Sequence, residues 1–257
     1  MSRIDIAKKG FKIKDFELVK KSHTKDAIKE SLHSEKHTTN FNLPEIILGG
    51  QDGLVNVLGI ILGMAAATSS SHIVIIAGLA ATFAESISMA AVAYTSKLAE
   101  ADFYQSEYER EKWEIDHVPE GEREEIRALY SQFGFKGKIL EDIVKTITSD
   151  KELWVKIMME QELKLEKVDR KEAIPAAIIV GFSALVGSFI PLIPFMLFHI
   201  SVATIISLII STIILFIVGY YKAKKTIGRN YVRMGIEMAV IGMVSALAGY
   251  LVGSFFK

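Results

Sequence analysis

Two pairs of glutamates spaced three residues apart mark the charged middle of the chain: Glu111 with Glu114, and Glu122 with Glu125. On a helix, residues at this spacing meet on one surface, where like charges repel each other. Helix stability therefore gives no reason for the pairs, whereas a bound divalent cation does. Oxygen ligands alone suit Mg²⁺, Ca²⁺ or Mn²⁺. For any single pair, a solvated helix face is the ordinary alternative.

A nearby segment, KIMMEQE at residues 156–162, adds sulfur to this chemistry. Glu162 lies four and three positions after Met158 and Met159, so a helix would place all three side chains on one face. Thioether ligands soften an oxygen site and favour a later first-row ion such as Fe²⁺. Packing between helices is the alternative role for the methionines. The chain has no Cys, which excludes thiolate metal sites, disulfides and a Cys nucleophile.

Long apolar stretches flank these acidic segments. A helix needs ~20 apolar residues to span a bilayer. Five stretches satisfy this length, at residues 44–68, 72–98, 173–197, 200–221 and 232–256. The third contains Pro191 and Pro194, which are expected to kink or end it. The sequence thus predicts an all-α membrane protein with five transmembrane helices.

The residues between the second and third spans are predicted to form a separate helical domain. The second span continues into YQSEYEREKWEID without a helix breaker, VPEG marks a turn, and Gly134 ends the next helix. Ser149 and Asp150 form a candidate N-cap for a later helix. An amphipathic helix is also expected near residues 26–37. The predicted domains are an N-terminal arm (1–43), spans one and two (44–98), a helical metal-binding domain (99–171) and spans three to five (172–257).

Basic residues predict the orientation of the spans. The arm at 1–43 holds 10 bases and 6 acids, and the loop YKAKKTIGRNYVR between spans four and five is strongly basic. The turns at 69–72 and 198–201 contain no Lys or Arg. Because basic loops stay on the cytoplasmic side, the arm, the loop and the inserted helical domain are all expected there. Residues 100–170 carry 19 acids and 12 bases, and acids contribute little to this rule.

Four acids lie within the predicted spans: Glu45, Asp52, Glu85 and Glu237. A charge at the bilayer centre costs about 2.5–3.5 kcal/mol on insertion scales, so such residues usually face a cavity and serve a function. We expect no Lys or Arg at comparable depth to neutralise them, which leaves a cation or a proton as the counter-charge. Glu45 and Glu237 lie near an interface, where contact with water is the alternative explanation.

Helix geometry relates these acids to Met89. With a rise of 1.5 Å per residue, Asp52 lies ~13 Å inside the membrane on span one, and Met89 lies ~12 Å inside on span two. Glu45 is two turns before Asp52, and Glu85 is one turn deeper than Met89. The four side chains are therefore expected to line one path. Ordinary packing is the alternative for Met89.

Four motifs, QDGLVNVLGIILG, ESISMAAVAYTS, EREEIRALYSQFGF and VKIMMEQEL, make residues 43–256 resemble the vacuolar iron transporter family. The resemblance implies a homodimer that exports Fe²⁺, sometimes Mn²⁺, from the cytoplasm into a vacuole or out of the cell by proton antiport. It also implies an ion path between the paired first and second spans at the dimer interface. Fe²⁺ or another divalent cation would then be the substrate, with no permanently bound cofactor.

The resemblance also implies roles for individual residues. Asp52 of the DGL motif and Met89 of the ISMA motif match the family's transmembrane ion ligands, and Glu45 matches an acid at the cytoplasmic entrance. The residues that match the family's metal-binding domain are Glu111, Glu114, Glu122, Glu125, Met158, Met159 and Glu162.

This sequence departs from the family after the ISMA motif. The family often has Gly-Glu-Tyr there, whereas this chain has Val92, Ala93 and Tyr94. Glu85 lies about two turns away on a similar face. We hypothesise that Glu85 replaces the missing acid in proton coupling.

Two other classes of function compete with transport. The first is a membrane-anchored metal sensor or buffer, which would have no need of Asp52 and Glu85 inside the membrane. The second is a di-iron enzyme, for which Glu114 and His117 supply only one of the two required Glu-x-x-His motifs. We therefore expect no enzyme activity. The expected partners are membrane lipid, a second copy of the chain and divalent ions, without nucleic acid, in a prokaryotic plasma membrane more readily than a vacuolar one.

Overall fold

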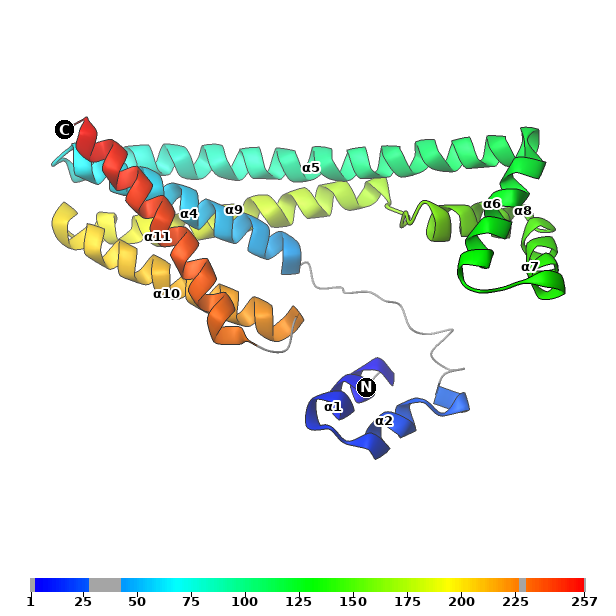
Figure 1. The fold of residues 1–257 in the computed structure, drawn as a ribbon. Coiled ribbons are helices and arrows are strands. Elements are labelled where there is room, and N and C mark those ends of the chain that lie inside the picture. The colour runs from blue at the N-terminus through cyan, green and yellow to red at the C-terminus, as the bar shows by residue number, and fades with distance from the viewer. Residues whose placement is uncertain (1–2, 28–42, 227–229, 257) are drawn as a thin grey trace. The chain divides into compact units, whose positions relative to one another are not determined.

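The computed structural model describes residues 3–27, 43–226 and 230–256, which form helices and contain no strand. The chain divides into two compact units, Met1–Asn42 and Leu43–Lys257. The larger unit contains five helices that are long and apolar enough to cross a membrane. These helices are α4 (Leu43–Ala67), α5 (Ser71–His117), α9 (Ala173–Leu197), α10 (Ile200–Thr226) and α11 (Tyr231–Phe255), shown in Figure 1. The prediction of an all-helical protein with five candidate spans is confirmed.

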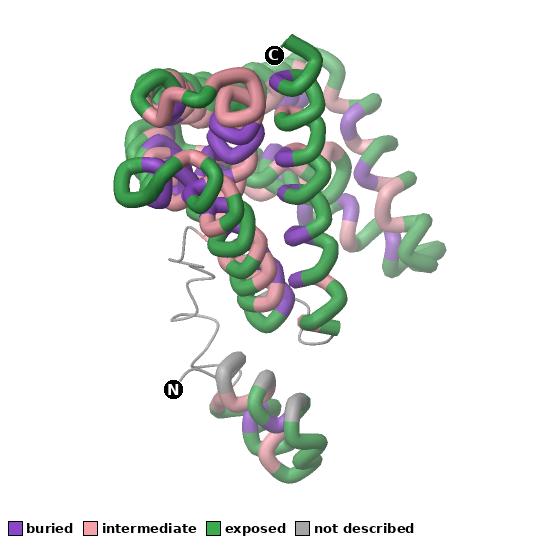
Figure 2. The backbone as a smooth tube through the Cα atoms, turned by 90° about the vertical axis from the view of Figure 1, so that its left-hand side faces the viewer, coloured by how far each residue is buried: buried purple, intermediate pink, exposed green. Residues whose placement is uncertain are grey.

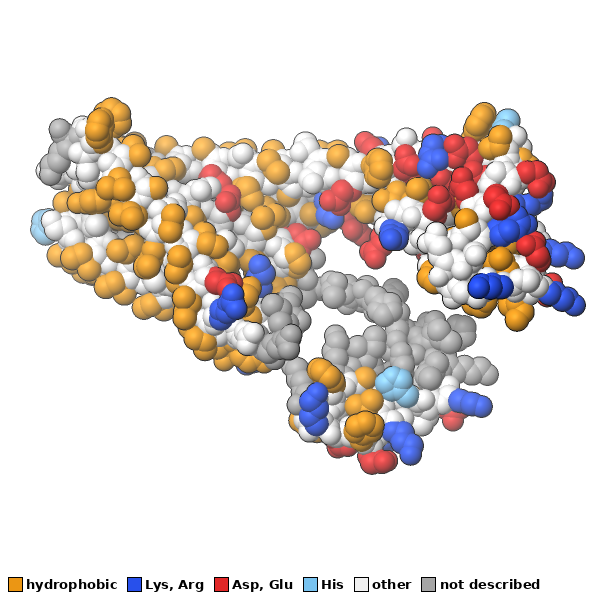
Figure 3. Space-filling model, viewed as in Figure 1, with side chains coloured by type: hydrophobic (Ala, Val, Ile, Leu, Met, Phe, Trp, Pro, Cys, Tyr) orange, Lys and Arg blue, Asp and Glu red, His pale blue; other side chains and the backbone are white. Residues whose placement is uncertain are grey.

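Helix α5 extends far beyond the length that a bilayer requires. Its 47 residues correspond to about 70 Å of helix, whereas the hydrocarbon core of a bilayer is ~30 Å thick. The apolar first half packs against α4 and α9, and the charged second half continues without a break to His117 (Figure 1). Figure 3 shows hydrophobic side chains over the spans and acidic and basic side chains gathered at the far end of α5.

Short helices at that end form the rest of the polar region. They are α6 (Pro119–Gln132), α7 (Gly137–Thr148), α8 (Lys151–Ile157), a π-helical turn η1 (Met158–Glu162) and a 3₁₀ turn η2 (Arg170–Glu172). Gly134 follows the end of α6 with a φ of +92°, as expected for a helix stop. Asp150 caps α8 by accepting hydrogen bonds from the Glu152 and Leu153 amides at 3.0 and 3.2 Å.

The π-helical turn differs from the regular helix expected at residues 156–162. The amide of Leu163 donates to the Met158 carbonyl, five residues earlier, at 3.0 Å. Such turns are rare and are often found at functional sites. Each residue in a π turn is rotated by a smaller angle than in an α-helix, and the shared face of Glu162, Met158 and Met159 stays a prediction.

Glycines allow the spans to pack closely around α4. A Cβ atom on Gly53 would lie 2.3 Å from the Ala184 carbonyl oxygen of α9, and one on Gly249 of α11 would lie 2.0 Å from the Gly59 carbonyl oxygen. In a membrane, close backbone approach of this kind stabilises helix pairs. Along α11, which ends at the label C in Figure 2, buried and exposed residues alternate as the helix turns. Helix α9 continues through Pro191 and Pro194 and ends at Leu197.

The smaller unit contains two helices in its described part, α1 (Arg3–Ile13) and α2 (Phe16–Ser22). They pack against each other where Gly10 meets Val19. Neither helix was predicted from the sequence. The amphipathic helix expected near residues 26–37 lies almost wholly outside the described residues.

We expect Gly249→Ala to destabilise the spans, because its methyl group would collide with the backbone of Gly59. Gly121→Ala is the matched control, since a Cβ atom at Gly121 meets nothing within 4 Å on the exposed surface of α6. Thermal unfolding in detergent measures both variants. The melting temperature should fall for Gly249→Ala and stay level or rise for Gly121→Ala, because alanine favours a helix by about 1 kcal/mol over glycine. Equal melting temperatures would contradict the proposed close packing.

Candidate metal centre

Three glutamates converge where α5 ends and α6 begins. Glu111, Glu114 and Glu122 each offer one carboxylate oxygen, and these oxygens all lie within 4.8 Å of one another. Val118 is the C-cap that ends helix α5, and Pro119 is the first residue of α6, a position where proline is favoured because its missing N–H is not needed. The chain reverses at these two residues, so that α5 and α6 face each other. Hard divalent cations take several carboxylate oxygens at short range, which makes this group a candidate site.

Burial distinguishes these acids from ordinary surface glutamates. The residues Glu111 and Glu122 are only 2% and 3% exposed. One oxygen of each, Oε2, is buried without a hydrogen-bond partner among the described residues. A buried carboxylate is costly unless it is paired or protonated. The donor set therefore fits a cation, which would supply the missing partner for both oxygens.

Electrostatic interactions extend the group to five acids. Burial raises the pKa of Glu111 to about 7, the Arg110 guanidinium opposes this shift, and the Glu162, Glu114 and Glu125 carboxylates add to it. Burial also raises the pKa of Glu122 to about 7, with further contributions from Glu125 and Glu111. The pKa of Glu162 is raised by burial and then by Glu125. We call Glu111, Glu114, Glu122, Glu125 and Glu162 the carboxylate cluster.

Arginine lies at the edge of the carboxylate cluster without neutralising it. The Arg110 guanidinium contacts Glu111 at 2.7 Å and Glu114 at 2.5 Å. It also binds Glu107, which lies outside the cluster, at 2.8 Å. One cation is thus shared among three carboxylates, two of which belong to the cluster. A surplus of negative charge remains in the cluster for a divalent ion.

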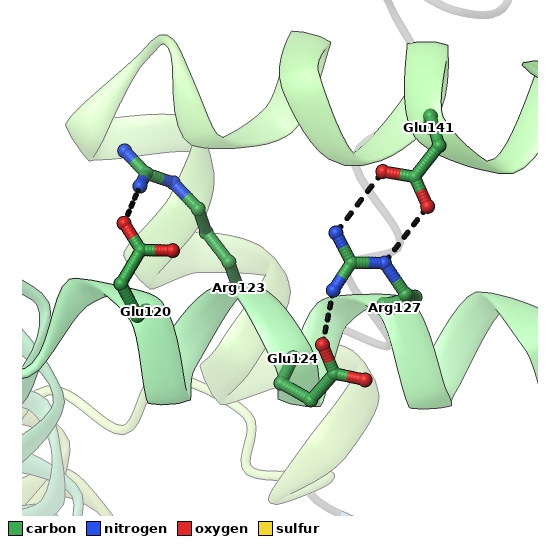
Figure 4. Close-up of polar contacts among 5 residues, drawn as sticks. All are labelled: Glu120, Arg123, Glu124, Arg127 and Glu141. Carbon is green, nitrogen blue, oxygen red and sulfur yellow. Dashed lines mark hydrogen bonds and ion pairs between the residues drawn. The ribbon is translucent and has the colours of Figure 1, made fainter.

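The outer face of α6 provides an internal comparison. Figure 4 shows Glu120 ion-paired with Arg123, and Glu124 ion-paired with Arg127. Arg127 also reaches α7, where its Nε and Nη2 atoms donate to Glu141 at 2.8 and 3.0 Å. Acids on the outside of the helix therefore have cationic partners. In contrast, the buried Oε2 of Glu122 on the same helix has no hydrogen-bond partner within the described part of the chain.

The methionines lie in an apolar core beside these acids. Met158 and Met159 are 0% and 1% exposed. They pack in one cluster with Ile115, Ile126 and Trp154. This burial is what a packing role requires, and a role for either sulfur as an ion ligand stays a prediction.

A second group of polar side chains lies within the spans. The Asp52 carboxyl on α4 lies near Glu85 on α5 and interacts with it electrostatically. The Asn56 amide donates to Glu85 Oε1 at 3.0 Å. Asp52 is thus a neighbour of Glu85, and its placement level with Met89 stays a prediction. Sequence reasoning missed Asn56, although a polar residue one turn after Asp52 in an apolar span was an available signal.

The other predicted residues of the path are less closely associated. Glu45, in the first turn of α4, is half-buried and interacts electrostatically with Lys97 of α5. Met89 is half-buried on α5, one turn from Glu85. Glu237 is ion-paired with Arg233 at 2.9 Å. The expectation that no basic residue accompanies the acids of the spans is therefore wrong for Glu237, because Arg233 lies one helical turn before it. It is also wrong for Glu45, which has Lys97 as a cationic neighbour.

The fold and these two acidic groups define a class: a multi-pass helical membrane protein with carboxylates in its spans and a candidate metal site on a long extended helix. A model of the VIT family matches residues 43–254. Vacuolar iron transporter 1 of Arabidopsis thaliana is 36% identical over 220 residues, which cover 85% of this chain and 88% of the plant protein. The Toxoplasma gondii vacuolar iron transporter is 28% identical over 265 residues, covering 98% and 87%. The chain belongs to the VIT family.

The raised pKa values of Glu111 and Glu122 predict how stability depends on pH. Because the folded cluster holds protons that the unfolded chain releases above its ordinary pKa of 4.5, the free energy of unfolding should rise as pH falls from 8 to 6. Glu122→Gln should raise the melting temperature of metal-free protein at pH 8 and flatten this dependence. A gain of ~1 kcal/mol corresponds to about 2–4 °C for a chain of this size.

Glu124→Gln is the matched control for this measurement, because Glu124 lies on the outer face of α6 and is paired with Arg127. It should leave the pH dependence between 8 and 6 unchanged. A metal-free protein whose melting temperature falls on acidification over this range would contradict the assignment.

Proposed function

We propose that this protein is a secondary transporter that moves Fe²⁺, and also Mn²⁺ or similar divalent ions, out of the cytoplasm in exchange for protons. Membership of the VIT family, and relatives named vacuolar iron transporters, support metal ion transport as the general activity. The identity of the ion, the direction and the proton coupling are parts of the proposal. The choice of ion and the proton coupling are argued from this chain's own residues, whereas the direction follows the resemblance to the family.

The observation that carries the proposal is the Asp52–Glu85 pair with its Asn56 partner inside the spans. A protein that only anchors a metal-binding domain has no use for two carboxyl groups at this depth, where a charge costs about 2.5–3.5 kcal/mol. A transporter needs such carboxyl groups, because a cation that crosses the membrane requires oxygen ligands within the spans. Two adjacent carboxyl groups can hold either a divalent cation or protons in its place.

The proposed route begins at the carboxylate cluster. Its acids would collect ions next to the membrane, and their raised pKa values mean that binding an ion at neutral pH releases protons. Glu45 would stand at the mouth of the path, Asp52 and Met89 would bind the ion within the membrane, and Glu85 would carry the exchanged proton. Helix α5 connects the two sites, since it contains acids of the carboxylate cluster at one end and Glu85 within its span.

Topology and assembly complete the proposal. The basic N-terminal arm and the loop between α10 and α11 support a cytoplasmic N-terminus and a cytoplasmic domain at 99–171 by the positive-inside rule. We place the protein as a homodimer in the plasma membrane of a prokaryote. The two first spans would face each other across the dimer axis.

Proteoliposomes with an acidic lumen test the function directly. We expect Fe²⁺ to enter as protons leave, with smaller fluxes of Mn²⁺ and still smaller fluxes of Zn²⁺ and Ca²⁺. Asp52→Asn should reduce the Fe²⁺ flux to the level of protein-free liposomes, because the variant loses an anionic ligand within the span. Glu237→Gln is the matched control, an acid in a span that Arg233 already neutralises, and it should transport normally. Stoichiometric Fe²⁺ binding without any flux would identify a sensor or buffer instead.

Glu85→Gln separates ion binding from proton coupling. The variant keeps a group that can accept the Asn56 hydrogen bond but cannot exchange a proton. We expect the flux driven by the pH gradient to disappear, while calorimetry shows Fe²⁺ binding to the carboxylate cluster at unchanged affinity. Full pH-driven flux in this variant would remove Glu85 from the mechanism.

A further inference from the structure

The turn between α1 and α2 exposes three large apolar side chains within six residues. Phe11 is 68% exposed, Ile13 is 60% exposed and Phe16 is 88% exposed. In the described part of the N-terminal unit these are the exposed large hydrophobic residues. Water is an unfavourable surrounding for such a group, and clustered exposure of this kind marks an interaction surface.

The local structure explains why these side chains cannot turn inward. Gly10 and Val19 form the tight contact between the two short helices and leave no room for a larger side chain there. Lys14 adopts a left-handed backbone conformation with a φ of 57°, and Asp15 caps α2 by accepting from the Leu18 amide at 3.0 Å. The turn is therefore fixed with its apolar side chains pointing outward.

Basic residues surround this apolar turn. Residues 3–27 hold eight Lys and Arg against four Asp and Glu. Exposed lysines lie on both helices and on the turn between them, at Lys9, Lys14, Lys20 and Lys21. The Lys14 ammonium lies 4.1 Å from the centre of the Phe11 ring, which places charge and apolar surface side by side. A basic helical surface with exposed aromatic residues is typical of segments that lie in a membrane interface.

We propose that the N-terminal unit binds the surface of an anionic phospholipid bilayer, with Phe11, Ile13 and Phe16 inserted between the headgroups and the lysines paired with lipid phosphates. The covalent connection favours this partner, because residues 28–42 lead directly into the first span at Leu43 and can extend over about 55 Å at most. A bilayer surface is therefore always within reach. The acidic surface of α6 and α7 is a less suitable partner, since Glu120, Glu124 and Glu141 already pair with arginines.

The absence of Cys makes a site-specific probe simple to introduce in the full chain. Phe16→Cys, labelled with the environment-sensitive fluorophore NBD, is reconstituted in nanodiscs of phosphatidylcholine alone or mixed with phosphatidylglycerol. We expect blue-shifted and several-fold brighter emission only in the anionic discs. Thr24→Cys carries the same label at an exposed polar position of the unit and should report water in both.

Variants that remove a lysine test whether charge attraction to the anionic lipid causes the blue shift of the emission. Lys14→Gln and Lys21→Gln, in the labelled Phe16→Cys background, should each lower the ratio of inserted to water-exposed probe by about fivefold, because each basic residue near an anionic surface contributes ~1 kcal/mol. Equal emission in zwitterionic and anionic discs would overturn the proposal. A blue shift that persists in detergent but disappears in the triple variant Glu120→Gln/Glu124→Gln/Glu141→Gln would also overturn the proposal. That result would show that the N-terminal unit binds the acidic surface of α6 and α7 instead.

Discussion

A carboxylate that is removed from water must gain a partner, and this requirement shapes the protein at two levels. In the polar region, Glu111 and Glu122 are almost completely buried and each keeps one oxygen without a hydrogen-bond partner in the described structure. In the spans, Asp52 lies against Glu85, and Asn56 supplies a hydrogen bond to the pair. Neither arrangement stabilises the folded protein, because burying an unpaired charge is far less favourable in free energy than burying an apolar group at the same position. Both are understandable if the missing partner arrives as an exchangeable cation or proton.

The scaffold around these acids is closely packed. Glycine contacts hold α4 against α9 and α11, and α4 presents Asp52 and Asn56. Helix α5 carries Glu85 in its apolar half and continues as a single rod to Glu111 and Glu114. The turn at Val118 and Pro119 then brings Glu122 opposite them. One uninterrupted helix thus connects the two groups of acids. This connection supports the proposal that both groups bind the same ion along one transport path.

Much of this architecture follows from the sequence, for identifiable reasons. Twenty or more apolar residues have few alternatives to a membrane helix, and Gly134 and Asp150 are strong local signals for helix ends. The glutamate pairs were visible from their spacing. Spacing does not show that pairs on α5 and α6 meet, because that depends on how the chain reverses. The π turn at Met158 and the Asn56 hydrogen bond were also missed, since each depends on local geometry that a regular helical period does not predict. The Arg233–Glu237 ion pair was missed although its spacing of four residues is the one at which side chains of a helix meet.

The comparison between Glu120 and Glu122 shows why composition alone would mislead at this site. Both acids lie in the first turn of α6, only two residues apart. A charge count treats them as equal, and either could belong to a solvated helix face. Glu120 is exposed and pairs with Arg123, so its charge is already balanced. Glu122 points into the space that Glu111 and Glu114 share, where burial raises its pKa to about 7. In the described structure, α6 neutralises its outer acids Glu120 and Glu124 with arginine and leaves one oxygen of Glu122 without a hydrogen-bond partner, which is the charge distribution that the proposed cation site requires.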